Sequence, residues 1–242
     1  GPQGTLYGAS AMGGAFKVMF NRPDLSRAGA TLDTELSVTD RVRGDAQTLV
    51  INQPLVSDKL GLRLAAYRRA DPPFAQNERL GLSRTNASSA EGFRLGVGAQ
   101  PTENLELNLT LAHQDAIEED TGASALGGPS HVSQNYMRTP FKSEMTLYEG
   151  AANWRVAGVR VTGMAAGYRW DSTRQIEYTG VLLAERTSME GCQRYLGLPL
   201  GGRCTPAELG SYSTYVDSRT PGLLNQPINL IARIGELRVQ SE

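Results

Sequence analysis

Apolar and polar residues alternate along much of this chain with a period of two. In the segment 105–111 the odd positions are all leucine, whereas the even positions are Glu106, Asn108 and Thr110. This pattern is typical of a β-strand with one apolar and one polar face. The segment 93–100 alternates in the same way, and only residues 101–104 separate the two. The pair therefore predicts a β-hairpin with a tight turn.

Similar segments recur and predict an all-β chain. Eight strands are expected, at about 32–39, 46–55, 59–69, 93–100, 105–114, 145–156, 159–171 and 230–242. Three connectors are tight, near Ser57, Thr102 and Gly158. Apart from the connector of the first pair of strands, the others are long and rich in Gly, Pro, Ser and Asn, at about 70–90, 116–143 and 172–229. A compact soluble domain rarely holds several loops of that length, whereas an outer-membrane barrel has short turns at one end and long loops at the other. The pattern favours an antiparallel transmembrane β-barrel segment.

The faces opposite the apolar ones collect charged side chains. Those predicted to face inward are Arg63, Arg94, Glu106, Glu149 and Arg169. A dry sheet core could hold such residues only with extensive pairing, whereas a wide, water-filled lumen accepts them. We therefore expect these five residues to line a ligand path, where the arginines would favour an anionic ligand and the two glutamates would oppose that preference.

Aromatic placement indicates the same architecture. Tyr148 and Trp154 share one face of their strand, and Tyr168 and Trp170 share one face of the next. The six-residue separation of the first pair corresponds to about 20 Å along a strand, close to the apolar band of about 25 Å in outer-membrane barrels. We interpret the four residues as parts of two aromatic girdles. The alternative is four aromatic residues in the core of an ordinary sheet.

Composition limits the classes of molecule with which the chain is expected to interact. Charged residues make up 20% of the 242 residues, the formal net charge is -1, and no apolar run reaches the length of a membrane-spanning helix. A spanning strand needs only about 9 to 11 residues, so a membrane location stays open. The absence of a basic run argues against a nucleic-acid partner. Outer-membrane lipid is the expected surrounding.

Few residues suggest a disulfide, a metal site or a catalytic site. Cys192 and Cys204 have eleven residues between them, a spacing that suits a local disulfide in an oxidising compartment, although two unpaired thiols are the alternative. His113 lies five residues before Glu118, and a metal site there is conceivable, but a solvated acidic loop explains the acidic residues better. No Ser, His and Asp arrangement points to an enzyme. No catalytic residue, metal ligand or cofactor is predicted.

The opening of the chain carries a resemblance. GPQGTLYG at residues 1–8, Gly13 and Gly14 followed by Ala15, and the stretch 21–23 resemble the end of the plug domain in TonB-dependent outer-membrane receptors. The residues of this motif are Gly1, Pro2, Gln3, Gly4, Thr5, Leu6, Tyr7, Gly8, Gly13 and Gly14. The closing sequence GELRVQSE is similar to a strand that many members carry partway round the barrel. Phe16 departs from the usual Ile or Val.

The resemblance implies that residues 1–24 end a plug domain and that residues 25–242 form the first part of a barrel of about 22 strands. It further implies a receptor in the outer membrane of a Gram-negative bacterium, which imports a scarce nutrient, most commonly a ferric siderophore or similar iron chelate. Energy would come from the TonB–ExbB–ExbD system. Because the chain begins within the plug, we expect it to be an internal fragment of a longer product.

Two other classes of function stay open. A small closed barrel of eight strands could act as a passive pore or a structural outer-membrane protein, but it would have no use for a plug remnant before its first strand. A barrel enzyme would need a serine beside a histidine, or converging acidic residues, on inward faces. Active transport is the function that the sequence favours.

Overall fold

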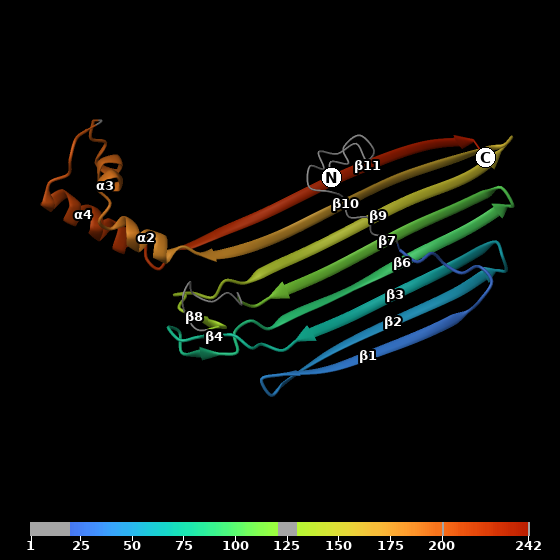
Figure 1. The fold of residues 1–242 in the computed structure, drawn as a ribbon, viewed down its shortest axis with the longest axis horizontal. Coiled ribbons are helices and arrows are strands. Elements are labelled where there is room, and N and C mark those ends of the chain that lie inside the picture. Colours follow the sequence, from blue (N-terminus) through green and yellow to red (C-terminus); the bar gives the residue numbers. More distant parts are fainter. Residues whose placement is uncertain (1–19, 121–129, 200, 242) are drawn as a thin grey trace.

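The computed structural model describes residues 20–120, 130–199 and 201–241. Its main element is an antiparallel sheet of eight strands that follow one another across the sheet in chain order (Figure 1). The strands are β1 (Gly29–Thr39), β2 (Val42–Val56), β3 (Leu60–Asp71), β6 (Ser88–Thr102), β7 (Leu105–Glu118), β9 (Phe141–Val156), β10 (Val159–Glu177) and β11 (Leu223–Ser241). The predicted eight antiparallel strands are confirmed, whereas the expectation of an all-β chain is wrong, because three helices accompany the sheet.

The tight turns lie where the alternation predicts them. Short connections join β2 to β3, β6 to β7 and β9 to β10, all at one end of the sheet. In the last of these, Ala157 and Gly158 have φ of 50° and 74°, the left-handed backbone that suits a two-residue hairpin turn. A further tight turn, at Asp40 and Arg41, joins β1 to β2 at the opposite end.

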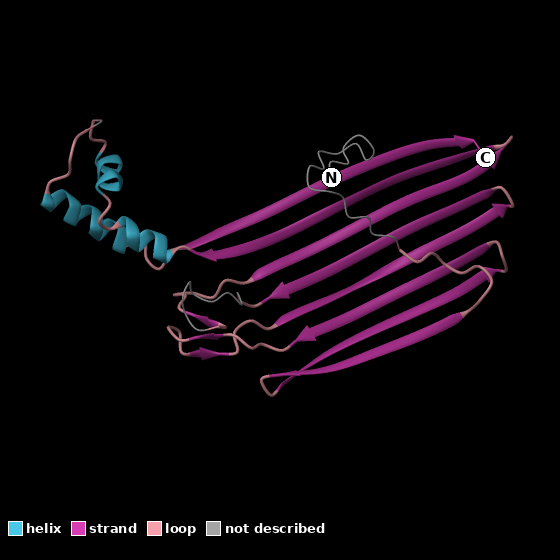
Figure 2. Ribbon diagram, viewed as in Figure 1, coloured by secondary structure: helices cyan, strands magenta, loops and turns pink. Residues whose placement is uncertain are grey.

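Long connectors occupy that opposite end. Two of them, 72–87 and 119–140, contribute a small three-stranded sheet in the order β5-β4-β8. Its strands are β4 (Gln76–Asn77), β5 (Leu82–Ser83) and β8 (Val132–Ser133). The third, 178–222, contains the helices α2 (Thr179–Glu185), α3 (Met189–Leu196) and α4 (Pro206–Asp217), which extend beyond the sheet (Figure 2). The alternation of strands predicted none of these helices.

None of the helices in the described residues has the length and apolar character needed to cross a bilayer. The sheet itself is open and does not close into a barrel. Within the described residues, β1 pairs only with β2, and β11 pairs only with β10. Each outer strand therefore has one edge of backbone donors and acceptors without a partner strand.

Among the described residues, no apolar core packs on the main sheet. Six apolar residues are buried in the described part of the chain: Ala75, Val132, Cys192, Cys204, Tyr212 and Val216. All six lie in the long connectors, and the last four form a small cluster among the helices. The large apolar side chains of the sheet are partly or fully exposed instead. Backbone pairing between the strands therefore holds the sheet together.

Strand register determines which residues share a face, because residues directly opposite each other project to the same side. One face, here called the apolar face, carries Leu64, Leu95, Leu111 and Tyr148 in one row across four strands. The other, here called the polar face, carries the alternating positions.

The register corrects the expected aromatic girdles. Tyr148 pairs with Gly167, so Tyr148 and Trp154 lie on the apolar face, whereas Tyr168 and Trp170 lie on the polar face. The two pairs do not belong to one belt. The two-residue turn between β9 and β10 is the cause, because it pairs Val156 with Val159 and so places even positions of one strand beside odd positions of the other.

Candidate functional site

The polar face holds four of the five predicted ligand-path residues. Register places Arg63, Arg94, Glu106 and Glu149 on it, on β3, β6, β7 and β9. The fifth, Arg169, pairs with Thr146 and lies on the apolar face, where its side chain forms an ion pair with Asp171. The prediction that Arg169 faces the same side as the other four is wrong.

The chain segment before β1 crosses the polar face. Here called the entry segment, it comprises residues 20–28 and appears as the irregular stretch leading to β1 in Figure 2. Arg22 forms an ion pair with Glu106, and the Arg94 guanidinium lies over the Phe20 ring, 4.6 Å from its centroid. Both partners belong to the polar face. The charged side chains predicted to contact a ligand therefore also hold this segment.

Glycines make room for the entry segment. A Cβ atom placed on Gly98 would lie 3.4 Å from three ring atoms of Pro23, and one on Gly61 would lie 3.0 Å from Leu25. A larger side chain at either position would displace the segment, because these separations leave only van der Waals distance. Gly96 approaches Pro23 in the same way, at 3.6 Å.

Asn52 ties the segment to β2 with three hydrogen bonds. Its Oδ1 accepts from the Asp24 amide at 2.8 Å, and its Nδ2 donates to the carbonyls of Asp24 and Arg27 at 2.8 and 2.6 Å. Asn52 is 6% exposed, so these bonds satisfy a buried amide. The sequence offered no specific indication of this role, because a single Asn in a strand has no pattern.

A turn within the segment stabilises its shape. The Asp24 carboxylate accepts from the amide and hydroxyl of Ser26, at 2.8 and 2.7 Å, and from the amide of Arg27 at 3.1 Å. The Ser26 hydroxyl, the Ser26 amide and, less strongly, the Arg27 amide favour the ionised form, and they lower the pKa of Asp24. The turn is therefore strongest with Asp24 charged.

Positive charge on the polar face is only partly compensated. Glu106 is engaged by Arg22, and it also accepts from Asn108 at 3.0 Å. Arg63 and Arg94 form no ion pair with any described residue, and Arg63 Nε is buried without a hydrogen-bond partner among them. Arg63 lies opposite Gly96 and Arg94 opposite Ala65, so the two arginines are diagonal neighbours on this face and their like charges repel. An anion would relieve that repulsion.

The described parts of connectors 72–87 and 119–140 form a rim at one end of the sheet, where they contact each other. Within the small sheet, Asn77 is fully buried and donates to the Asn135 carbonyl at 3.0 Å. Arg79 lies 3.9 Å from the Tyr136 ring centroid and donates to the Gln134 carbonyl. Connectors 72–87 and 119–140 therefore hold each other, and the rim does not consist of independent loops.

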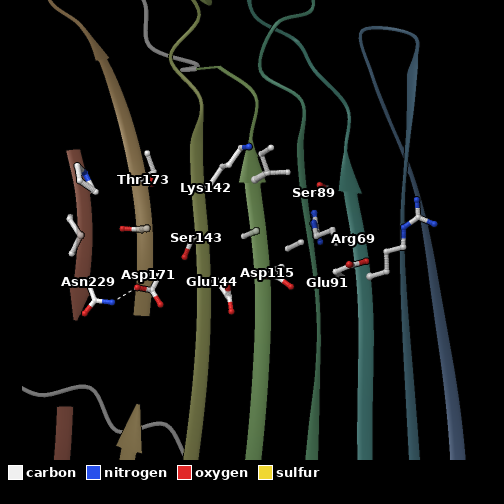
Figure 3. Close-up of a pocket in the computed structure, with 17 residues that line it drawn as sticks. Arg69, Ser89, Glu91, Asp115, Lys142, Ser143, Glu144, Asp171, Thr173 and Asn229 are labelled. Carbon is white, nitrogen blue, oxygen red and sulfur yellow. Dashed lines mark hydrogen bonds between the residues drawn. The ribbon is translucent and has the colours of Figure 1, made fainter. Parts of the chain in front are cut away.

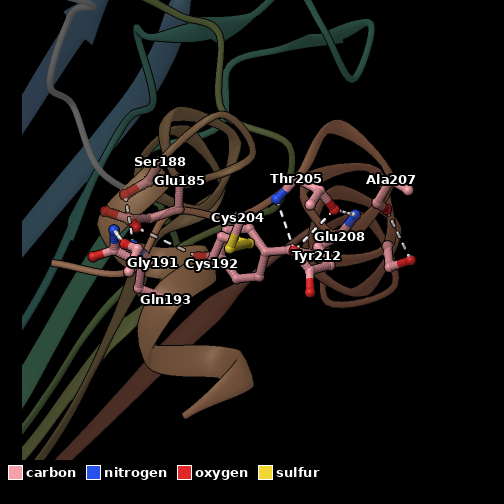
Figure 4. Close-up of a disulfide and its surroundings, with 12 residues drawn as sticks. Glu185, Ser188, Gly191, Cys192, Gln193, Cys204, Thr205, Ala207, Glu208 and Tyr212 are labelled. Atoms are coloured by element: carbon pink, nitrogen blue, oxygen red, sulfur yellow. Dashed lines mark hydrogen bonds between the residues drawn. A yellow bond between two sulfur atoms is a disulfide. The ribbon is translucent and has the colours of Figure 1, made fainter. Parts of the chain in front are cut away.

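The predicted disulfide is present. Cys192 and Cys204 are joined across twelve positions of sequence, and both are buried against Tyr212 (Figure 4). Burial, and secondly the charge of Glu185, raise the pKa of Tyr212. The helices around the bond have ordinary capping signatures in the sequence, which strand alternation does not reveal. Thr205 and Glu208 cap α4 reciprocally, with Pro206 in the first turn.

The plug-like motif lies outside the described residues. Gly1, Pro2, Gln3, Gly4, Thr5, Leu6, Tyr7, Gly8, Gly13 and Gly14 all precede residue 20, so the structure leaves that resemblance untested. No family model, curated protein or solved structure matches the chain.

Proposed function

We propose that this chain is part of an outer-membrane, TonB-dependent receptor that imports a scarce nutrient. The observation that carries the proposal is the two-faced sheet. One face exposes large apolar side chains with no core against them, and the other holds charged residues and the entry segment. Lipid on the first side and a wet lumen on the second satisfy both faces at once.

The apolar face supports the membrane part of the proposal. Leu109 is 60% exposed, Leu237 73% and Trp154 49%. Soluble monomers rarely expose a contiguous apolar surface of this kind. The distance along β9 from Tyr148 to Trp154 is about 20 Å, so the aromatic residues on this face bracket most of a bilayer core.

The open edges fit a wall of a larger barrel. Unpaired strand edges are unsuited to lipid, because no water is there to satisfy the backbone groups. Under this proposal further strands pair with β1 and β11 and close a barrel of about 22 strands. The long connectors then lie on the extracellular side, and the tight turns lie on the periplasmic side.

The entry segment supports transport over passive diffusion. It lies on the face that becomes the lumen, where the resemblance places the last part of a plug. Movement of a plug would reach the barrel wall through Asn52 and Glu106. Energy would come from TonB–ExbB–ExbD. No catalytic group or cofactor is part of this proposal.

The ligand class follows from the uncompensated arginines. Arg63 and Arg94 favour an anion, and a ferric chelate with carboxylate or catecholate groups is the default nutrient. Arg169, which the sequence had grouped with them, has its own carboxylate partner on the lipid-facing side.

Uptake assays test the proposal. Cells that express the full-length gene product would be given radiolabelled ferric chelates, with and without a functional TonB. We expect uptake that requires TonB and that falls when Arg63 and Arg94 are both replaced by glutamine. Arg169→Gln is the matched control, and it should leave uptake unchanged. Uptake of many small solutes without TonB would overturn the proposal in favour of a passive barrel.

A further inference from the structure

A row of polar residues crosses the sheet at the long-connector end of the apolar face. Consecutive register partners on six strands form it: Arg68, Glu91, Asp115, Glu144, Asp171 and Asn229. All six line a shallow depression of about 910 Å³ (Figure 3). Four carboxyl groups in adjacent register are unfavourable, because like charges directly opposite each other destabilise a sheet.

The ends of this row have neighbours that reduce the repulsion. Asp171 forms an ion pair with Arg169 and accepts a hydrogen bond from Asn229, and Arg68 lies opposite Glu91. The two central carboxylates of the row, Asp115 and Glu144, differ from these end residues. Asp115 and Glu144 lie side by side on β7 and β9, and Glu144 forms no hydrogen bond or ion pair with any described residue (Figure 3).

A histidine completes the central group. His113 is two residues before Asp115 on β7, and its Nε2 lies 3.2 Å from Asp115 Oδ2. Nδ1 lies 2.9 Å from the Thr146 hydroxyl on the facing strand. With Nδ1 donating to Thr146, the lone pair of Nε2 points to the carboxylates. A hydrogen bond from the ring nitrogen that does not bind the metal, here Nδ1, is how proteins orient a histidine ligand.

We infer that His113, Asp115 and Glu144 bind a divalent transition-metal cation between β7 and β9. One ligand atom from each of the three lies within 4.8 Å of the others. One imidazole and two carboxylates suit Zn²⁺, Co²⁺ or Ni²⁺ better than Ca²⁺, which prefers oxygen alone. The cation neutralises the two opposed carboxylates and links the two strands. Asp115 and Glu144 are exposed, so further coordination positions face outward, where water or an external donor can bind.

Neighbouring residues hold the imidazole of His113 in place, and nearby cations compete with a metal for Glu144. Phe93 packs 6.0 Å from the His113 ring on the side of β6, which limits the movement of the imidazole. Lys142 shares the face of Glu144 two residues earlier, and Arg169 lies opposite Thr146. Arg169 is paired with Asp171 but also attracts Glu144, so Arg169 and Lys142 are both cations that compete with a metal for Glu144.

Co²⁺ alone is the probe for this site. The full-length protein, folded in detergent micelles, would be titrated with Co²⁺ by calorimetry and by visible absorption. We expect one equivalent to bind, with the absorption of a nitrogen and oxygen ligand set. His113→Ala and Glu144→Gln should each weaken binding by at least about tenfold, and Thr146→Val by roughly 10- to 100-fold through loss of orientation.

Two matched variants serve as controls. His131→Ala removes the other histidine, and Glu91→Gln removes a carboxylate of the same row that lies outside the group. Both should bind Co²⁺ like the wild type. Glu144→Gln preserves size and tests the site even where His113→Ala fails to fold. Absence of Co²⁺ binding at millimolar concentration, or binding unchanged by both His113→Ala and Glu144→Gln, would overturn the inference. The titration does not depend on transport, so its outcome is independent of the proposed function.

Discussion

Replacement of Leu109 by arginine tests which medium covers the apolar face. Leu109 lies opposite Gly150 on β9, two positions from the row of Tyr148 and four from the row of Trp154. At about 3.4 Å per residue, these rows are about 7 and 14 Å away, so Leu109 lies well inside the apolar band. Arginine near the bilayer midplane costs about 2–4 kcal/mol in a membrane barrel.

The expected result is a loss of about 30- to 1,000-fold in the folding equilibrium constant. Thr110→Arg, one residue along on the polar face, should cost much less. Leu105→Arg, at the turn end, should cost about 0–1 kcal/mol. If water covered this face, a residue as exposed as Leu109 would tolerate the change within about 0.5 kcal/mol.

The assay is urea titration of the full-length protein in lipid vesicles, with the folded fraction measured by heat-modifiable electrophoretic migration. The comparison among the three variants matters more than any single value. Equal costs for Leu109→Arg and Thr110→Arg, or a cost independent of depth, would refute the assignment of lipid to the apolar face.

Three further outcomes are expected. Replacing Cys192 and Cys204 by serine should destabilise the helical connector by about 3 kcal/mol on the chain-entropy estimate, seen as faster proteolysis within 178–222 while the sheet stays protected. Gly98→Leu should displace the entry segment and expose it to trypsin, whereas Gly235→Leu, with open space around it, should not. Because the pKa of Asp24 is lowered in the folded protein, its turn is fully stabilised above the ordinary carboxyl pKa of 3.8 and is lost as the pH falls through the lower folded value. Hydrogen exchange of the Arg27 amide should report this pH dependence. Asp24→Asn should abolish it.

Alternation predicted the strands well and their ends poorly. The strand expected from residue 93 begins at Ser88, and the one expected from residue 230 begins at Leu223. In both extensions polar or apolar residues follow one another without alternation, so the faces cannot be told apart from sequence. Pairing with a neighbouring strand, which the sequence does not display, extends them.

The sequence predicts which residues of one strand share a face. Which residues of two neighbouring strands lie on the same side of the sheet depends on the register. Arg169 was placed with Glu149 because each is polar within its own strand. The two-residue turn at Ala157 and Gly158 reverses that match. The sequence does carry this information, because a two-residue hairpin turn pairs even positions with odd ones. Contacts of the entry segment were not predictable, since they depend on which glycines lie beneath it.

The chain-order meander has a kinetic consequence. Every strand of the main sheet pairs with its neighbours in sequence, so the sheet can form by successive addition of hairpins without any distant partner. Four strand pairs are joined by tight turns: β1–β2, β2–β3, β6–β7 and β9–β10. They have little loop-closure entropy to lose, and they should form first. Each doubling of connector length adds only about 0.6 kcal/mol to the free energy of loop closure. Even the long connector 178–222 therefore delays the pairing of β11 with β10 only modestly. Its disulfide shortens the effective loop further, so β11 pairs with a hairpin, β9–β10, that has already formed.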